Sequence, residues 1–291
     1  MLSKNPDQLE TLACLIIDDP LLRPKYGCLS YARLLEQMKT HRFFTEIAFI
    51  PWNFRRSDPK TIQLFKDNPD YFGMCVHGCN HLDNEFGRGT YPELSALAST
   101  AMWRMDGHQK LTGLTYDPVF VFPQGHFSSL AMQALKDQGF LAACNTILET
   151  TDGEKPPEIE FHLPATRHYH DFPLFLRRYP HDKALYPQDI AEGRPVLIVE
   201  HHTAFRHGYR AITDLVDWIN SSGNIRWTSL GHIAEHYTGN RVVSTIPVAH
   251  PGPTNLLLDI KTGLRRYLSE VRDNYFETND LLNQVFRAIK K

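Results

Sequence analysis

Four side chains of the kinds that bind divalent metal ions follow two apolar runs of this chain. Asp18 and Asp19 come directly after Leu15–Ile17, and His77 and His81 follow a second run. One of two neighbouring carboxylates can hold a metal ion while the other takes a proton from water. Two histidines four residues apart can bind the same ion across a helical turn. The combination indicates hydrolytic chemistry with an activated water molecule.

Each motif by itself also has a simpler interpretation. Asp-Asp-Pro after an apolar strand is most often a turn or a helix cap, and a histidine pair at this spacing is about as often two unrelated side chains. The occurrence of both motifs, in this order, is what favours a metal site.

Short apolar runs alternate with segments of helical period, which is the pattern of β-α units and a mainly parallel sheet. The predicted strands are Leu12–Asp18, Glu46–Ile50, Phe72–Val76, Pro118–Phe122, Phe140–Cys144, Phe172–Leu176, Pro195–Glu200 and Ile225–Thr228. The predicted helices are Leu29–His41, Pro59–Lys66, Pro92–Leu111, Ser129–Gln138 and Tyr209–Ser221. Asp58, ahead of Pro59, and Ser128 are suited to cap two of these helices.

Further polar candidates follow the predicted strands. They are Trp52 after the second strand, Gln124, Gly125 and His126 after the fourth, and His201 and His202 after the seventh. In a parallel α/β barrel the carboxyl ends of the strands meet at one mouth, where reacting groups gather. We therefore expect these side chains to surround a single site.

The chain of 291 residues is long enough for one barrel-sized domain. We expect an α/β barrel over residues 1–240, followed by a linker and a helical extension over residues 241–291. The extension holds two stretches of helical period, Leu256–Val271 and Asn279–Ile289, and the second carries an apolar stripe. Such a stripe predicts packing on the barrel or on a second subunit, as in a homo-oligomer.

Composition argues against several classes of partner. The formal net charge is −2 with a pI near 6.7, and no basic stripe suited to nucleic acid is present. No apolar run is long enough to span a membrane, and Met1–Leu12 is not of signal-peptide type. Five scattered cysteines do not suggest a disulfide framework. We expect a cytoplasmic protein that binds neither nucleic acid nor membranes.

The chain resembles the polysaccharide deacetylases, carbohydrate esterase family four, over residues 10 to about 240. The motifs of that family run in the order Asp-Asp, His-x-x-x-His, a Pro-Tyr or Pro-Gly turn, and a His that ends a late apolar strand. The matching stretches are Ile17-Asp18-Asp19, His77 to His81, Phe122-Pro123-Gln124-Gly125 and Val199-Glu200-His201, with Trp227-Thr228-Ser229-Leu230 as the last strand and turn.

The resemblance implies a distorted seven- to eight-stranded (β/α) barrel of the glycoside hydrolase and deacetylase type, with the C-terminal helices as an extension. It also implies a metal-dependent hydrolase that removes an N-acetyl or related acyl group from a small or oligomeric sugar-like substrate. Asp19, His77 and His81 then bind one divalent ion, with Zn²⁺ favoured over Fe, Co, Ni or Mn. Asp18 is the general base and His201 the general acid.

The chain departs from the family pattern at three places. Val121 stands where the family has an arginine two residues before its proline, so that charge is either missing or supplied elsewhere, with Arg55, Arg56 and Arg178 as candidates. Gln124 replaces a tyrosine. A literal Asp-x-x-Asp-Trp motif at 214–218 lies after the His201 strand, within a predicted helix, and we interpret it as accidental.

The substrate is expected to contact Trp52, Gln124, Gly125, His126 and His202. A backbone N–H near Gln124 or Gly125 would stabilise the oxyanion. Only one of His201 and His202 can point into the mouth if the strand continues, and the resemblance favours His201. Phe122 and Phe127 are either part of an aromatic wall beside Trp52 and His126, or core residues.

Two other functions fit some of the same residues. Two histidines and one carboxylate also describe the facial triad of non-haem iron enzymes, although those enzymes present it from antiparallel sheets. Loss of the arginine at Val121 would also suit a catalytically impaired homologue that only binds metal or carbohydrate. Specificity is expected to lie in the Thr150–Pro187 loops and in the C-terminal extension.

Overall fold

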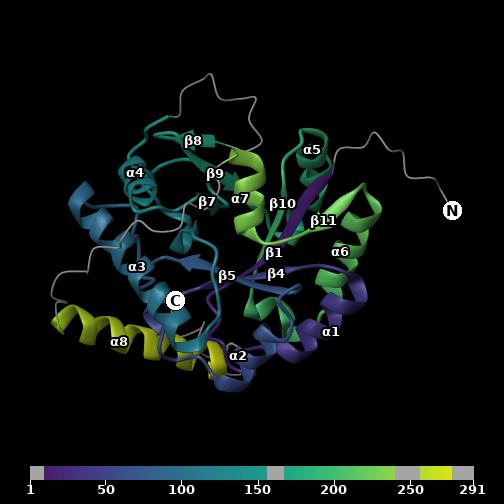
Figure 1. Cartoon of the computed structure of the whole chain (residues 1–291), viewed down its shortest axis with the longest axis horizontal. Coiled ribbons are helices and arrows are strands. Elements are labelled where there is room, and N and C mark those ends of the chain that lie inside the picture. Colours follow the sequence, from purple (N-terminus) through teal and green to yellow (C-terminus); the bar gives the residue numbers. More distant parts are fainter. Residues whose placement is uncertain (1–9, 156–166, 240–255, 277–291) are drawn as a thin grey trace.

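The computed structural model describes residues 10–155, 167–239 and 256–276. Within them, seven parallel strands lie side by side in the order β10-β1-β4-β5-β6-β7-β9 (Figure 1). Their bounds are β1 Thr11–Asp18, β4 Thr45–Phe49, β5 Phe72–His77, β6 Val119–Val121, β7 Ala142–Asn145, β9 Phe172–Leu176 and β10 Val196–His201. Arg178, just past β9, pairs with Ile198 of β10 and closes the ring. The predicted distorted barrel is confirmed.

Shorter strands and the helices surround this ring. The remaining strands are β8 Arg167–Tyr169, antiparallel to β9; β11 Ile225–Trp227, beside the start of β1; and the hairpin β2 Lys25–Tyr26 with β3 Leu29–Ser30. The helices are α1 Tyr31–His41, α2 Pro59–Lys66, α3 Tyr91–Thr112, α4 Ser129–Asp137, α5 Tyr186–Ala191, α6 Arg210–Ser221, α7 Leu230–Thr238 and α8 Leu256–Val271.

The strands are buried on both faces, so alternate residues enter two separate cores. One core lies between the strands and the outer helices and includes Leu15 and Ile17 of β1. The other fills the barrel and is lined by Leu12, Cys14 and Ile16 of β1, Ala48, Cys75, Val119, Val121, Ala142, Cys144, Phe175 and Leu197. Apolar residues of α7 join this inner core and close the amino-terminal end of the barrel. The carboxyl ends of the strands form the opposite mouth.

Most of the elements predicted from the sequence are present, with shifted ends. Asp58 caps α2 and Ser128 caps α4, each by accepting backbone N–H groups of the first turn. The predicted helix at Leu29–His41 begins later, at Tyr31, because Leu29 and Ser30 pair with the β2 strand. The elements β2, β3, β8, α5 and α7 were not predicted because they are short and their apolar patterns are weak.

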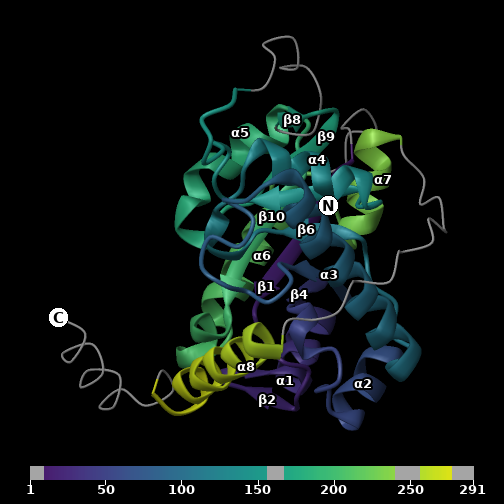
Figure 2. The same ribbon diagram turned by 90° about the vertical axis from the view of Figure 1, so that its left-hand side faces the viewer.

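The C-terminal extension is described only in part. Helix α8 has the predicted bounds and lies along the lower edge of the molecule in both views (Figures 1 and 2). The predicted helix Asn279–Ile289, and with it the expectation of a homo-oligomer, lies outside the described residues. Among the residues that are described, no helix has the length and apolar character needed to cross a membrane.

Candidate metal centre

The alternation of inner and outer residues places the metal-site candidates at the mouth of the barrel. Asp18 continues the inward-facing series of β1, and His77 lies two residues after the inward-facing Cys75. Asp19 and His81 lie in the loops that follow β1 and β5. Both have positive φ, 79° and 58°, a conformation that non-glycine residues adopt rarely.

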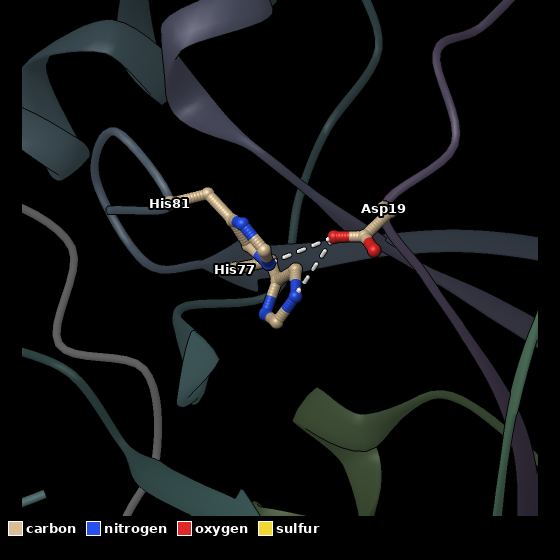
Figure 3. A group of neighbouring side chains, drawn as sticks. All are labelled: Asp19, His77 and His81. Carbon is tan, nitrogen blue, oxygen red and sulfur yellow. Dashed lines mark ion pairs between the residues drawn. The ribbon is translucent and has the colours of Figure 1, made fainter. Parts of the chain in front are cut away.

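The three predicted ligands converge on a common point (Figure 3). One oxygen of Asp19, Oδ1, lies 3.2 Å from Nε2 of His77 and 3.0 Å from Nε2 of His81. The candidate ligand atoms all lie within 4.8 Å of one another. Ligands about 2 Å from a zinc ion are separated by roughly 3–3.5 Å, so this spacing suits a single ion.

The hydrogen bonds around the site also fit a metal ion. Nδ1 of His77 lies 3.0 Å from the carbonyl oxygen of Val121. A carbonyl can only accept, so Nδ1 carries the proton and Nε2 presents a lone pair. Within the described residues, the buried Oδ1 of Asp19 accepts no hydrogen bond of good geometry. An orphaned carboxylate oxygen facing two imidazole nitrogens is the donor set expected of a cation site.

The charge of Asp19 is stabilised by its neighbours. Burial alone would raise the pKa of this carboxyl, but the nearby His81 and His77 imidazoles outweigh burial and hold the pKa well below its usual value. Asp19 is therefore ionised at neutral pH, as metal binding requires.

His81 is held in a loop, so the predicted helical turn between the two histidines is wrong. The carboxylate of Glu85 accepts the backbone N–H groups of Cys79, Asn80 and His81, at 3.0, 2.8 and 3.1 Å. A tight turn forms around this carboxylate and brings His81 back towards His77. The four-residue spacing did indicate a ligand pair, but a loop and not a helical turn brings the two histidines together.

Gly78 and Arg104 complete the support of this loop. Gly78 has a φ of +64°, and a Cβ there would come within 2.5 Å of Pro123 and 2.9 Å of Glu85. From α3, the buried Arg104 donates to the Cys79 carbonyl and to Oδ1 of Asn80, and its guanidinium stacks on Trp52. The histidine loop is thus fixed from both sides.

Asp18 is paired with an arginine that sequence reasoning missed. Nη1 of Arg177 donates to Oδ1 of Asp18 at 2.6 Å, and both side chains are 4% exposed. Burial tends to raise the pKa of Asp18, but Arg177, His77 and His201 together lower it.

The predicted substitutes for the missing arginine are therefore wrong. Arg178 binds Asp189 of α5, Arg56 binds Glu270, and Arg55 stacks on the ring of Phe54. Arg177 lies two residues after the inward-facing Phe175, so its side chain enters the barrel, whereas that of Arg178 points outward. Choosing between neighbouring arginines required knowing which face of the strand is inside.

His201 is aligned with Asp18, and His202 is not at the centre. His201 ends β10 and pairs in register with Asp18 across the parallel ladder. The strand stops there, and His202 begins a short helical turn. Its ring is buried against the edge of Tyr26 and directly over Gly27.

The other residues predicted to contact substrate follow the strands at the mouth and differ in how exposed they are. Trp52 is half-buried beneath Arg104, Gln124 and His126 are exposed on the loop after β6, and Gly125 is buried. Gln124 has a φ of 52°. Phe122 and Phe127 stack on each other with no exposed surface, so they are core residues and not part of a wall.

The Asp-x-x-Asp-Trp match at 214–218 lies on the outer helix α6, where Asp217 contacts His41. The motif is remote from the metal centre, which agrees with its interpretation as an accidental match.

Comparisons with known proteins show the likeness in the fold. No protein-family model and no curated protein matches this sequence. A solved structure assigned as a polysaccharide deacetylase from Mycobacterium smegmatis matches with a TM-score of 0.54 and 12% identity, covering 81% of this chain and 93% of that chain. This chain has the fold of the polysaccharide deacetylases.

Two further deacetylase-fold structures match at lower scores. The family 4 carbohydrate esterase from Streptomyces lividans, in complex with acetate, has a TM-score of 0.45 and 10% identity over 76% of this chain and 93% of that one. A family 4 pseudoenzyme from Bacillus anthracis has a TM-score of 0.42 and 11% identity over 74% and 60%. At such identities the likeness concerns the deacetylase fold and not the activity.

Proposed function

We propose that this protein is a metal-dependent hydrolase that removes an N-acetyl or related acyl group from a sugar-like substrate. The observation that carries the proposal is the convergence of Asp19, His77 and His81 beside the pair Asp18–Arg177. A divalent ion held there, with Zn²⁺ favoured, would activate a water molecule and polarise the acyl oxygen.

Asp18 acts as the general base. Its lowered pKa keeps the carboxyl ionised, so it can accept a proton from the attacking water molecule. Arg177 occupies one carboxylate oxygen, Oδ1, and thereby fixes the orientation of the group. The bond formed joins the water oxygen to the acyl carbon.

His201 acts as the general acid. It pairs in register with Asp18 and can give a proton to the departing amine as the C–N bond breaks, which yields acetate and a free amino sugar. The Gly125 N–H already donates to the Phe122 carbonyl, so of the two loop residues predicted to stabilise the oxyanion, Gln124 is the one we assign.

Two features favour this function over the alternatives. The impaired-homologue hypothesis depended on the missing arginine at Val121, and Arg177 supplies that charge from another strand. The facial-triad alternative was associated with antiparallel sheets, whereas the site here stands on parallel strands. A cytoplasmic location stays a prediction and would suit a small or lipid-linked sugar.

The ligand assignment is tested by metal content. We expect Asp19→Ala and His77→Ala each to lower bound metal from roughly one ion per chain to a small fraction, measured by mass spectrometry after dialysis. His207→Ala, which removes an exposed histidine, is the control and should keep its metal. Full occupancy in both ligand variants would refute the assignment.

Catalysis is tested separately, by acetate release from a panel of N-acetyl sugars. We expect Asp18→Asn to keep its metal and to lose about 10²- to 10⁴-fold in turnover. Tight metal binding by the unmodified protein with no acetate released from any sugar would instead favour a binding protein.

A further inference from the structure

The C-terminal extension contacts the barrel through a polar face. Thr262 and Arg266 of α8 and Asp273, just past its end, are buried. The apolar side chains Leu264, Tyr267 and Leu268 are on the outside, with exposures of 60, 61 and 57%. An ordinary surface helix buries its apolar stripe, so over residues 262–273, whose side chains the structure describes, the contact is specified by charge and hydrogen bonding.

The carboxylates of this face are occupied by neighbours on the barrel loops. Glu270 forms ion pairs with Arg23 at 2.6 Å and with Arg56. Asp273 accepts the hydroxyl of Tyr26 at 2.8 Å and also pairs with Arg272. These contacts bind the extension to the loops that follow β1 and β4, beside the mouth.

Arg266 is the exception. Its side chain is buried, with 7% of the residue exposed, and its Nε has no hydrogen-bond partner in the described part of the chain. The two carboxylates on the same face are already occupied by other residues. Burying a guanidinium whose Nε has no acceptor costs free energy, so a site that retains one is suited to an anion.

Arg266 lies close to the predicted substrate side of the metal centre. One turn earlier on the same helix, a side chain added at Gly263 would come within 3.7 Å of the Trp52 ring. Burial and Asp273 raise the pKa of Tyr26, Asp19 adds to that rise and Arg266 opposes it. Tyr26 is therefore within electrostatic reach of both the metal ligand and the arginine.

We propose that Arg266 binds an anionic group of the substrate, a carboxylate or a phosphate, while the acyl group lies at the Asp19–His77–His81 centre. The proposal rests on the function proposed above and names its substrate class as an acidic N-acetyl sugar. The planar guanidinium matches both anions with paired hydrogen bonds. Among the described residues of this junction, the arginines Arg23, Arg56, Arg266 and Arg272 outnumber the carboxylates Glu270 and Asp273, which adds attraction for an anion.

A kinetic comparison distinguishes the two anions. The substrates are N-acetylglucosamine, its 6-phosphate and N-acetylmuramic acid, which are neutral, phosphorylated and carboxylated. We expect Arg266→Met to lower kcat/KM for the preferred acidic substrate roughly ten- to a hundredfold and for the neutral one less than about twofold. Arg265→Met, an exposed neighbour on the same helix, should change neither. An equal effect on all three sugars, or none, would overturn the proposal.

If the protein hydrolyses none of these sugars, that result counts against the proposed function alone. A binding measurement then still tests the role of Arg266. Inorganic phosphate and acetate are titrated calorimetrically into the His77→Ala protein, where the metal centre is disabled. We expect binding that Arg266→Met abolishes and Arg266→Lys weakens. Unchanged binding, or a lowered Tm without any change in binding, would assign Arg266 a structural role and refute the proposal.

Discussion

At the scale of single residues, the buried pair Asp18–Arg177 sets the charge of the proposed general base. The carboxylate is almost fully buried, and without the guanidinium its pKa would rise because burial disfavours the charged form. Arg177 follows β9, which is two strands from the β6 strand of Val121 and, across the closure with β10, two strands from the β1 strand of Asp18. The charge at the base therefore depends on closure of the barrel.

We expect Arg177→Met to lower kcat/KM on the order of a hundredfold near neutral pH. Without Arg177 the pKa of Asp18 rises, and the carboxyl stays protonated up to a higher pH. The acid limb of the pH–rate profile should therefore move to higher pH. Removing one partner of a buried pair should also cost about 3–5 kcal/mol of stability, measured by denaturant unfolding.

Arg178→Met is the matched control for this prediction. It breaks the pair with Asp189 outside the barrel and should lower stability, but the acid limb should keep its position. If the two variants shifted that limb equally, the assigned role of Arg177 would be incorrect.

At the scale of elements, the loop after β5 is built around the carboxylate of Glu85. Glu85 accepts three successive N–H groups, and this places His81 against His77. Groups that orient metal ligands in this way affect metal affinity although they do not touch the ion.

We expect Glu85→Gln to weaken metal affinity about ten- to a hundredfold, because an amide offers one acceptor oxygen where the carboxylate offers two. The measurement is a competition titration with a chelator. Glu93→Gln at the start of α3, which alters the Thr90 capping box, serves as the control and should leave affinity unchanged. Equal affinity in the Glu85 variant would show that the loop holds its shape without this carboxylate.

At the scale of the whole molecule, the buried carboxyl group of Glu46 lies at the amino-terminal end of the barrel, opposite the mouth. Glu46 has no exposed surface and accepts the Leu230 N–H at the start of α7, where Asp117 accepts the Gly231 N–H. Burial raises the pKa of Glu46 well above its usual value, and the charge of Asp117 adds to the rise.

This carboxyl should make stability depend on pH. The folded protein keeps the Glu46 proton at pH values where the unfolded chain has lost it, so stability falls as pH rises through that window, by about 1.4 kcal/mol per pH unit. Glu46→Gln cannot ionise, and we expect it to be more stable than the unmodified protein at pH 8 and nearly equal at pH 4. Denaturant unfolding across pH 4–9 measures the difference, with the exposed Glu36→Gln as control. A difference that does not change with pH would contradict the prediction.

The sequence by itself determined the alternation of strands and helices and the order of the metal-site motifs. Asp18, Asp19, His77 and His81 could be singled out because side-chain chemistry and their positions after apolar runs are local properties of the chain, and the family resemblance implied that Asp19 is the ligand. Helix α8 was predicted with its observed bounds for the same reason.

Only the tertiary structure decided which distant side chains meet. Arg177 rather than Arg178 reaches Asp18 because ring closure sets which face of β9 is inside. Glu85 shapes the histidine turn, and Arg266 comes to the mouth from more than two hundred residues along the chain. Local patterns fix which residues a strand or helix can bury, but the register and closure of the barrel fix which of them become neighbours.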